Sequence, residues 1–355
     1  MKWHPIYLTG NTWMWIVGVY IAIASVTPVW ILLQPRVYLS SFLLYGMLIV
    51  ALIGVVISHA PLGGADGLPM VTGFAVDNGN GIQFMFPVLF TTVACGAISG
   101  FHSLVSSGTT SKQLEKETDA KPIAYGGMLL ECVLAVITVC AINFAYKYNA
   151  ANPDTALKGA TAIFAGGIAN MYAGFGPGAV TILRTLLTLT YSAFCLTSLD
   201  TATRLARFMF QEFWLEPGQT PKDVTEGWKK IMVNPYVATL ITVVLGILLG
   251  LNGYGKLWGL FGAANQLLAG IGLLAVATWL GNIGRNNKMF LIPMAFMIVV
   301  TIASLCLTIN NQIGIIAAGG ADWGPYAQAI LGALLVILAV VLVIEGVQTL
   351  AKNKK

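Results

Sequence analysis

The sequence predicts an all-α polytopic membrane protein. Of its 355 residues, 57% are hydrophobic and only 9% are charged, and the mean hydropathy is +0.79. Soluble domains carry roughly 25% charged residues. The apolar residues form runs of about 20, the length that a helix needs to span a bilayer. The net charge of +5 does not indicate nucleic acid as a partner, because the basic residues gather in particular loops, where they orient membrane helices.

The apolar runs and their boundaries predict the helices. We expect one membrane domain over residues 1–355 with about nine transmembrane helices, near residues 12–33, 37–58, 85–104, 123–146, 180–204, 231–251, 257–280, 289–309 and 325–350. The first two are separated at Gln34-Pro35-Arg36, because proline disfavours the continuation of a helix and its neighbours are polar. A loop rich in Gly, Pro and Asp follows the second span, and a loop of mixed charges follows the third.

Two stretches between these runs are predicted not to span. Residues 160–176 are apolar but too short to cross a bilayer, and they are interrupted by Gly166, Gly167, Gly174 and Gly176. A re-entrant or surface hairpin on the extracellular side fits this stretch better. Residues 205–230 are polar and basic, which predicts a cytoplasmic loop.

The distribution of basic residues predicts the orientation. Placing the C-terminus in the cytoplasm puts most of the 19 Lys and Arg residues on that side, including Arg36, Arg285 and Lys288. Positive residues concentrate in cytoplasmic loops of membrane proteins. With an odd number of spans, the N-terminus of this chain is then extracytoplasmic, in a multi-pass protein of the inner (plasma) membrane.

Residues 86–114, FPVLFTTVACGAISGFHSLVSSGTTSKQL, begin as a membrane helix and then lose their apolar character. Helix propensity is weak between Gly96 and Gly100, and a polar run with His102 follows. Unpaired peptide groups are costly in hydrocarbon, so such a break survives only where it is buried in protein or lines a wet cavity. This pattern is typical of a solute-binding segment in a transporter. The alternative is a helix that ends near Gly100, before a polar cytoplasmic loop.

Four motifs resemble those of a known family. They read CGAISGFHS with the following SKQL, FCLTSLDTATRLARFMFQE, LWGLFGAANQLLAG and ASVTPVWILLQPRVYLSS. In this order, and over essentially the whole chain, they resemble signature stretches of the carbon starvation protein A (CstA) family. The resemblance implies a secondary transporter of the amino acid–polyamine–organocation superfamily, with a LeuT-like helical bundle. It also implies uptake of small peptides or pyruvate, driven by a cation or proton gradient.

The resemblance further implies how the helices correspond. If the spans are helices four to twelve of the LeuT-like plan, the break at residues 96–100 lies in the broken sixth helix. Residues 160–176 then form the hairpin between helices seven and eight. Members of the family carry further helices upstream, including a broken first helix, and an external N-terminus without a signal sequence points the same way. We therefore expect a truncated product, a split-gene half or part of a chain, whose missing helices a separate chain could supply.

The helix break supplies the candidate substrate-binding residues Gly96, Ser99, Gly100, His102 and Ser103. Hydroxyl groups, and N–H groups freed at the glycines, could bind a carboxylate or a peptide group. An imidazole can exchange protons near neutral pH, and ionisable groups within a membrane are functional hypotheses by default. Alternatively, His102 lies at the cytoplasmic interface and caps the helix.

A second cluster predicts coupling to an ion or proton. Thr197, Ser198 and Asp200 lie together in LTSLDTATR, and oxygen ligands suit a hard cation such as Na⁺. In LeuT-like transporters a hydroxyl pair on the eighth helix belongs to a sodium site, which the resemblance assigns to Thr197 and Ser198. The alternatives are hydroxyls bonded back to their own helix and an ion pair of Asp200 with Arg204.

Three further polar side chains lie within predicted spans. Glu131 could carry the coupling proton, or it could be a buried neutral carboxyl group bonded to a backbone carbonyl. Asn265 and Gln266 could touch solute or bridge helices, and bridging is the more frequent use.

The sequence indicates neither an enzyme nor a metal site. The five Cys residues lie in apolar runs without CxxC or Cys/His ligand spacing, and HExxH and GxSxG motifs are absent. We expect no cofactor other than a coupling Na⁺ or H⁺. The expected partners are the lipid bilayer and a peptide or pyruvate, with no nucleic acid. The chain is interpreted as an alternating-access symporter. The alternatives are a non-transporting component (a partner half or a sensor subunit) and a passive channel.

Overall fold

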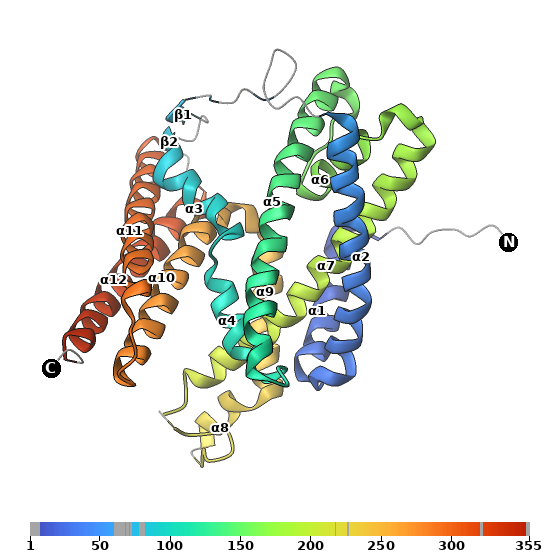
Figure 1. The fold of residues 1–355 in the computed structure, drawn as a ribbon. Helices are drawn as coiled ribbons and strands as arrows, with labels where there is room; N and C mark the ends of the chain where they lie inside the picture. The colour runs from blue at the N-terminus through green and yellow to red at the C-terminus, as the bar shows by residue number, and fades with distance from the viewer. Residues whose placement is uncertain are drawn as a thin grey trace. The chain divides into compact units, whose positions relative to one another are not determined.

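The computed structural model describes residues 8–59, 68, 71, 73–77, 82–216, 218–225, 227–319 and 322–352. Its contacts divide the chain into two compact units (Figure 1). Unit 1 comprises Met1–Met70 and Cys132–Asn252, and unit 2 comprises Val71–Glu131 and Gly253–Lys355. The expectation of a single membrane domain stays a prediction.

Unit 1 is built from helices, and its main core lies where four of them meet. The elements are α1 (Gly10–Val26), α2 (Val29–Ser58), the second part of α5 (Ala120–Ala151), α6 (Ala160–Asn170), α7 (Pro177–Glu212), α8 (Gly227–Val233) and α9 (Pro235–Leu251), with 3-10 turns at Pro153–Thr155 and Ala173–Phe175. The core joins α2, α5, α6 and α7 around Ala51, Ile137, Ile168 and Leu187. A smaller apolar cluster joins α1 to α9.

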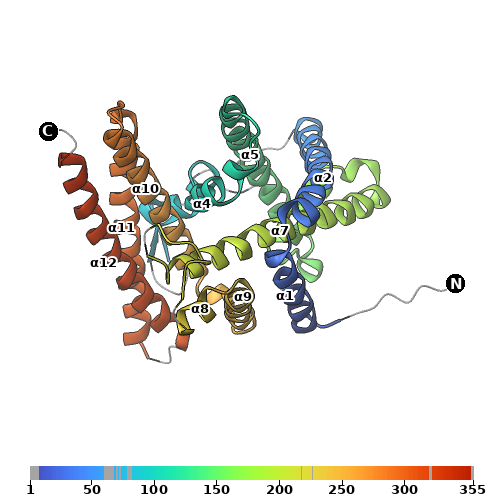
Figure 2. The same ribbon diagram turned by 90° about the horizontal axis from the view of Figure 1, so that it is seen from below.

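Unit 2 combines a short β-hairpin, a broken helix and a group of long helices. Its elements are β1 (Ala75–Asp77), β2 (Ile82–Phe84), a π turn (Met85–Leu89), α3 (Phe90–Val93), a 3-10 turn (Ala94–Gly96), α4 (Gly100–Gly108), 3-10 turns at Thr110–Lys112 and Glu117–Asp119, the first part of α5, a 3-10 turn (Tyr254–Lys256), α10 (Trp258–Asn282), α11 (Lys288–Ala317) and α12 (Trp323–Lys352). The hairpin pairs Ala75 with Phe84 in antiparallel register, where the sequence predicts a loop. Helices α10, α11 and α12 lie side by side (Figures 1 and 2) and share a core around Leu267, Leu305 and Ala339.

The helices confirm the all-α polytopic class. Among the described residues, seven helices are long and apolar enough to cross a membrane, or eight if α8 and α9, which bend by 63°, form one span. Helix α1 has 17 residues, fewer than the roughly 20 that a perpendicular span needs. The expected total of about nine spans stays a prediction.

Two predicted boundaries are wrong. The first two helices are separated at Thr27-Pro28, and Pro35 lies inside α2. Thr27 is extended, with φ −72° and ψ 140°, which is the conformation favoured before a proline. Helix α7 continues to Glu212, so residues 205–212 are helical and not part of a loop.

The stretch predicted to form a hairpin contains one short helix, α6, and a turn. Its residues from Phe164 to Ala169 are all buried. A Cβ atom on Gly167 would lie 2.1 Å from the carbonyl oxygen of Ala141, so this glycine lets α6 lie directly on the backbone of α5. Helix α6 is therefore docked in the core of unit 1, and its re-entry into a membrane stays a prediction.

Candidate functional site

The third predicted span, residues 85–104, is broken between Gly96 and Gly100, where its sequence predicts a break. The first half ends in the 3-10 turn that closes at Gly96, and the N–H of Ile98 bonds the Ala94 carbonyl at 2.8 Å. Ser99 is extended, with φ −138° and ψ 133°, and α4 begins at Gly100. The alternative of a helix that ends near Gly100 is wrong, because a helix resumes there.

The side chain of Asn265, from α10, fills the break. Its Oδ1 accepts a hydrogen bond from the N–H of Phe101 at 2.9 Å, and its Nδ2 donates to Ser99 Oγ at 3.0 Å. Both Asn265 and Ser99 are buried. The first N–H groups of a helix have no partner within it, so Asn265 supplies one for α4. It therefore bridges helices, while the neighbouring Gln266 is fully buried with neither amide atom bonded to a described residue.

Helix α4 packs closely on α10. A Cβ atom on Gly100 would lie 2.3 Å from the carbonyl oxygen of Asn265. Further along the two helices, a Cβ atom on Gly272 would lie 3.3 Å from Ser103, whose hydroxyl donates to the Gly100 carbonyl at 2.7 Å. Gly100 and Ser103 thus serve helix packing here, and their contact with a solute stays a prediction.

His102 and Glu131 are brought together from α4 and α5. His102 Nε2 lies 3.3 Å from Glu131 Oε2, and the two side chains are 54% and 34% exposed. Glu131 is therefore not the buried carboxyl group bonded to a backbone carbonyl that the alternative predicts. An imidazole in contact with a carboxylate can hold a proton or release it.

Asp200 lies in a buried ion pair of unit 1. Its Oδ2 is 2.6 Å from Arg36 Nη1 and accepts a hydrogen bond from the Tyr20 hydroxyl at 3.0 Å. Arg36 also donates to the Tyr20 hydroxyl. Because the carboxylate is neutralised by Arg36, the geometry favours a structural role for Asp200 over cation ligation. The predicted alternative, a salt bridge with Arg204, is wrong.

Arg204 instead caps the C-terminus of α1. Its Nη2 donates to the carbonyl oxygens of Ala24 and Thr27, both at 2.7 Å. The last carbonyls of a helix lack partners within it, so this arginine satisfies two groups where the chain leaves α1.

The hydroxyl pair of α7, Thr197 and Ser198, is only partly available to bind a cation. Thr197 Oγ1 donates to the Ala193 carbonyl at 2.9 Å, as the back-bonding alternative predicts, and Ser198 is exposed. A back-bonded hydroxyl still offers oxygen lone pairs to a cation. Thr197 and Ser198 belong to unit 1, and the helix break with His102 belongs to unit 2. Across the described ranges, His, Cys, Asp and Glu side chains form no group of three that could hold a metal ion.

Sequence reasoning missed Tyr20 and Arg36, the partners of Asp200. Arg36 was predicted to lie in a cytoplasmic turn, but it lies inside α2. One signal could have found the pair: Arg36 is the single charged residue of that apolar helix, and Asp200 is a lone carboxylate in the apolar part of another. Opposite charges in two apolar runs are expected to pair.

Comparison with known proteins places the chain in a family. The model of the family described as carbon starvation protein CstA matches residues 2–162 and 144–304. The peptide transporter CstA of Bacillus subtilis is 30% identical over 374 residues, which cover 95% of this chain and 60% of that protein. The peptide transporter CstA of Helicobacter pylori is 35% identical over 324 residues, covering 76% of this chain and 46% of that protein.

A further relative is named for a different substrate. The pyruvate/proton symporter BtsT of Escherichia coli is 41% identical over 127 residues, which cover 35% of this chain and 17% of that protein. No solved structure matches the chain significantly. The chain spans about half the length of the curated relatives it matches. Since the family model covers most of the sequence, the chain belongs to the carbon starvation protein CstA family.

Proposed function

We propose that this chain forms membrane-spanning helices of a secondary active transporter that takes up small peptides or pyruvate by symport, with no enzymatic activity. The observation that carries the proposal is the helix break beside Asn265, with His102 in the first turn after it and paired to Glu131 of α5. Discontinuous helices form the solute sites of many secondary transporters. The relatives named as a peptide transporter and as a pyruvate/proton symporter support the same activity.

We also propose a LeuT-like bundle in the inner (plasma) membrane. The order of a broken span, an unbroken helix and then the short docked helix α6 supports this fold. A solute carboxylate at the break would meet the N-terminal end of α4, and helix N-termini favour negative charge. Rocking of one group of helices against another would then alternate access to the solute.

The His102–Glu131 pair is the proposed coupling site. With a protonated imidazole and an ionised carboxylate the pair carries no net charge, and loss of the proton leaves one negative charge. Net charge is costly in apolar surroundings, so the protonated pair favours an occluded state. Na⁺ bound at Thr197 and Ser198 is the alternative. It has less support because the Thr197 hydroxyl is already bonded to its own helix.

Uptake by the chain in liposomes tests both assignments. We expect His102→Ala to abolish proton-driven uptake of trialanine or pyruvate while the melting temperature is kept. Ser106→Ala is the matched control, because this exposed serine lies on the same helix and its hydroxyl donates only to the Ser103 carbonyl of that helix. Loss of uptake in Thr197→Ala but not in His102→Ala would assign coupling to the hydroxyl pair. No uptake by the wild-type chain under a proton gradient or a sodium gradient would contradict the transport function.

A further inference from the structure

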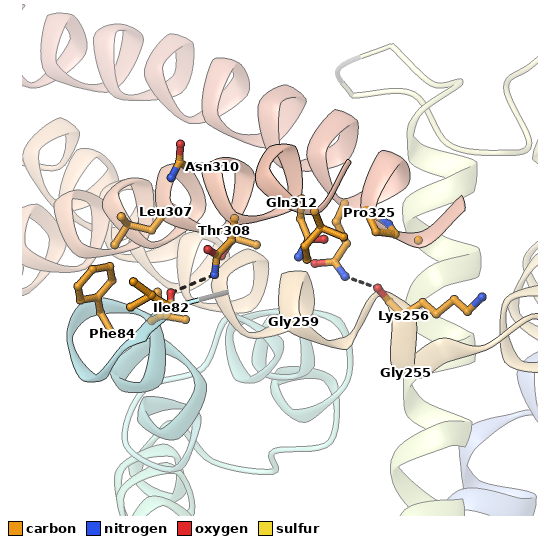
Figure 3. Close-up of a pocket in the computed structure, with 15 residues that line it drawn as sticks. Ile82, Phe84, Gly255, Lys256, Gly259, Leu307, Thr308, Asn310, Gln312 and Pro325 are labelled. Carbon is orange, nitrogen blue, oxygen red and sulfur yellow. Dashed lines mark hydrogen bonds between the residues drawn. The ribbon is translucent and has the colours of Figure 1, made fainter. Parts of the chain in front are cut away.

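Unit 2 holds a second candidate site, an open pocket of about 590 Å³. It lies between strand β2, the turn before α10, the end of α11 and the start of α12 (Figure 3). Pockets that bind small molecules typically enclose roughly 300–1,000 Å³. None of the candidate substrate residues of the helix break lines this pocket.

Carboxamide side chains supply the polar lining. Asn311 and Gln312 follow Thr308 on one face of α11, since residues three and four apart share a helix face. Gln328 comes from α12 and lines the same pocket. Apolar side chains, among them Phe84, complete the wall. A lining of this kind offers both hydrogen-bond donors and acceptors beside an apolar surface.

Several of these amide groups have unused hydrogen-bonding capacity. Gln328 is 9% exposed, and its Nε2 donates to the Lys256 carbonyl, but its Oε1 is buried without a partner among the described residues. That oxygen lies 3.5 Å from the position of a Cβ atom on Gly259, so the glycine leaves space in front of it. Asn311 Nδ2 donates to the Ile82 carbonyl at 3.1 Å. The side-chain amide of Gln312 makes no hydrogen bond to the described part of the chain.

The charge of the pocket is already balanced. Lys256 is paired with the carboxylate of Asp322, and its Nζ lies 5.4 Å from the centre of the Trp323 ring. A small anion such as pyruvate would have to compete with Asp322 for this lysine. Pyruvate would also fill little of the pocket, since one water occupies about 30 Å³ and a three-carbon acid matches only a few waters.

We propose that this pocket binds the main chain of a small peptide. The alternating N–H and C=O groups of a peptide match the free Gln328 oxygen and the Gln312 amide, and its side chains would lie on the apolar wall. Peptide binding by the pocket does not depend on the proposed function, but a role of the pocket in transport does. If the pocket serves transport, it favours peptides over pyruvate as the substrate. In the orientation that the basic residues predict, the pocket lies at the outer side of the helices.

Equilibrium binding of radiolabelled trialanine to the chain in lipid nanodiscs tests the site. We expect Gln312→Met and Gln328→Met each to raise Kd about tenfold. Gln312→Met keeps the test open if Gln328→Met misfolds, because the Gln312 amide bonds no described residue. Gln348→Met is the matched control, because Gln348 is an exposed glutamine of α12, the helix that carries Gln328. It lies about 30 Å from Gln328 along that helix, at 1.5 Å per residue. The Kd of this variant should equal that of the wild type.

The outcomes separate this site from the transport function. Absence of saturable trialanine binding by the wild type, or equal Kd values in all three variants, would overturn the site. Displacement of trialanine by pyruvate in the wild type would overturn its selectivity for peptides. Binding that the pocket variants weaken, together with no uptake by the wild type, would overturn the transport function and leave the site standing.

Discussion

At the scale of single residues, the pair of Asp200 and Arg36 holds opposite charges inside a predicted membrane segment. The Asp200 side chain is 3% exposed and that of Arg36 is 22% exposed. Asp200 Oδ1 and Arg36 Nε are buried without a partner among the described residues. Desolvation of such ions costs several kcal/mol each, which their mutual attraction offsets. Loss of one member therefore leaves an uncompensated charge.

We expect Asp200→Ala to destabilise the protein by about 3–5 kcal/mol, the usual cost of breaking a buried pair from one side. The double variant Asp200→Leu with Arg36→Leu should lose much less, because no charge remains. Thermal unfolding in detergent measures both, and the control is Asp154→Ala, at an exposed carboxylate that bonds no described residue. Additive losses in the double variant would contradict the coupling of the two charges.

Local helix propensity could not place Arg36 inside a helix, although its lone charge in an apolar run was a signal that it pairs. Arg36 follows Pro35 and resembles a turn residue, while Pro28 lies in an uncharged stretch. Both prolines disfavour helix at the residue before them, so propensity does not choose between the two positions. The contact with Asp200, far along the chain, allows Arg36 to lie within α2.

At the scale of helices, the break after Gly96 could be predicted and its surroundings could not. Weak helix propensity within an apolar run is a local property. The filling of the break by Asn265 depends on a distant helix. Gly100 shows the limit of the local signal, because a glycine can free the backbone for a solute or allow two helices to approach, and here it allows the approach to α10.

We expect Gly100→Ala to separate α4 from α10 and to cost about 1–3 kcal/mol, the range for overpacking. The added Cβ atom would lie 2.3 Å from a backbone oxygen, which cannot rotate away as a side chain can. Gly126→Ala in α5 is the matched control, because its Cβ atom would have no neighbour within 4 Å. That variant should be neutral or gain up to about 1 kcal/mol of helix propensity. A melting temperature for Gly100→Ala at or above that of Gly126→Ala would contradict the packing role.

At the scale of the whole molecule, the class could be predicted because it depends on the length and composition of apolar runs. The number of spans could not, since it depends on how helices end and bend. Helix α1 is short for a perpendicular span, and α9 meets α8 at 63°. Tilt and bending are set by packing and by interfacial anchors, and both are invisible in the length of an apolar run.

The charge distribution predicts the orientation of the molecule, and reporter fusions test it. Arg285 and Lys288 join α10 to α11, and Lys352 ends α12, so these ends should be cytoplasmic. We expect green fluorescent protein fused after Lys352 to fluoresce and alkaline phosphatase at that point to be inactive. Phosphatase fused after Gly255 should be active, because Gly255 lies in the turn before α10, at the end of that helix opposite to Arg285. The reversed pattern would contradict the orientation and would place the amide-lined pocket beside Lys256 on the cytoplasmic side, where it could not receive a peptide from outside.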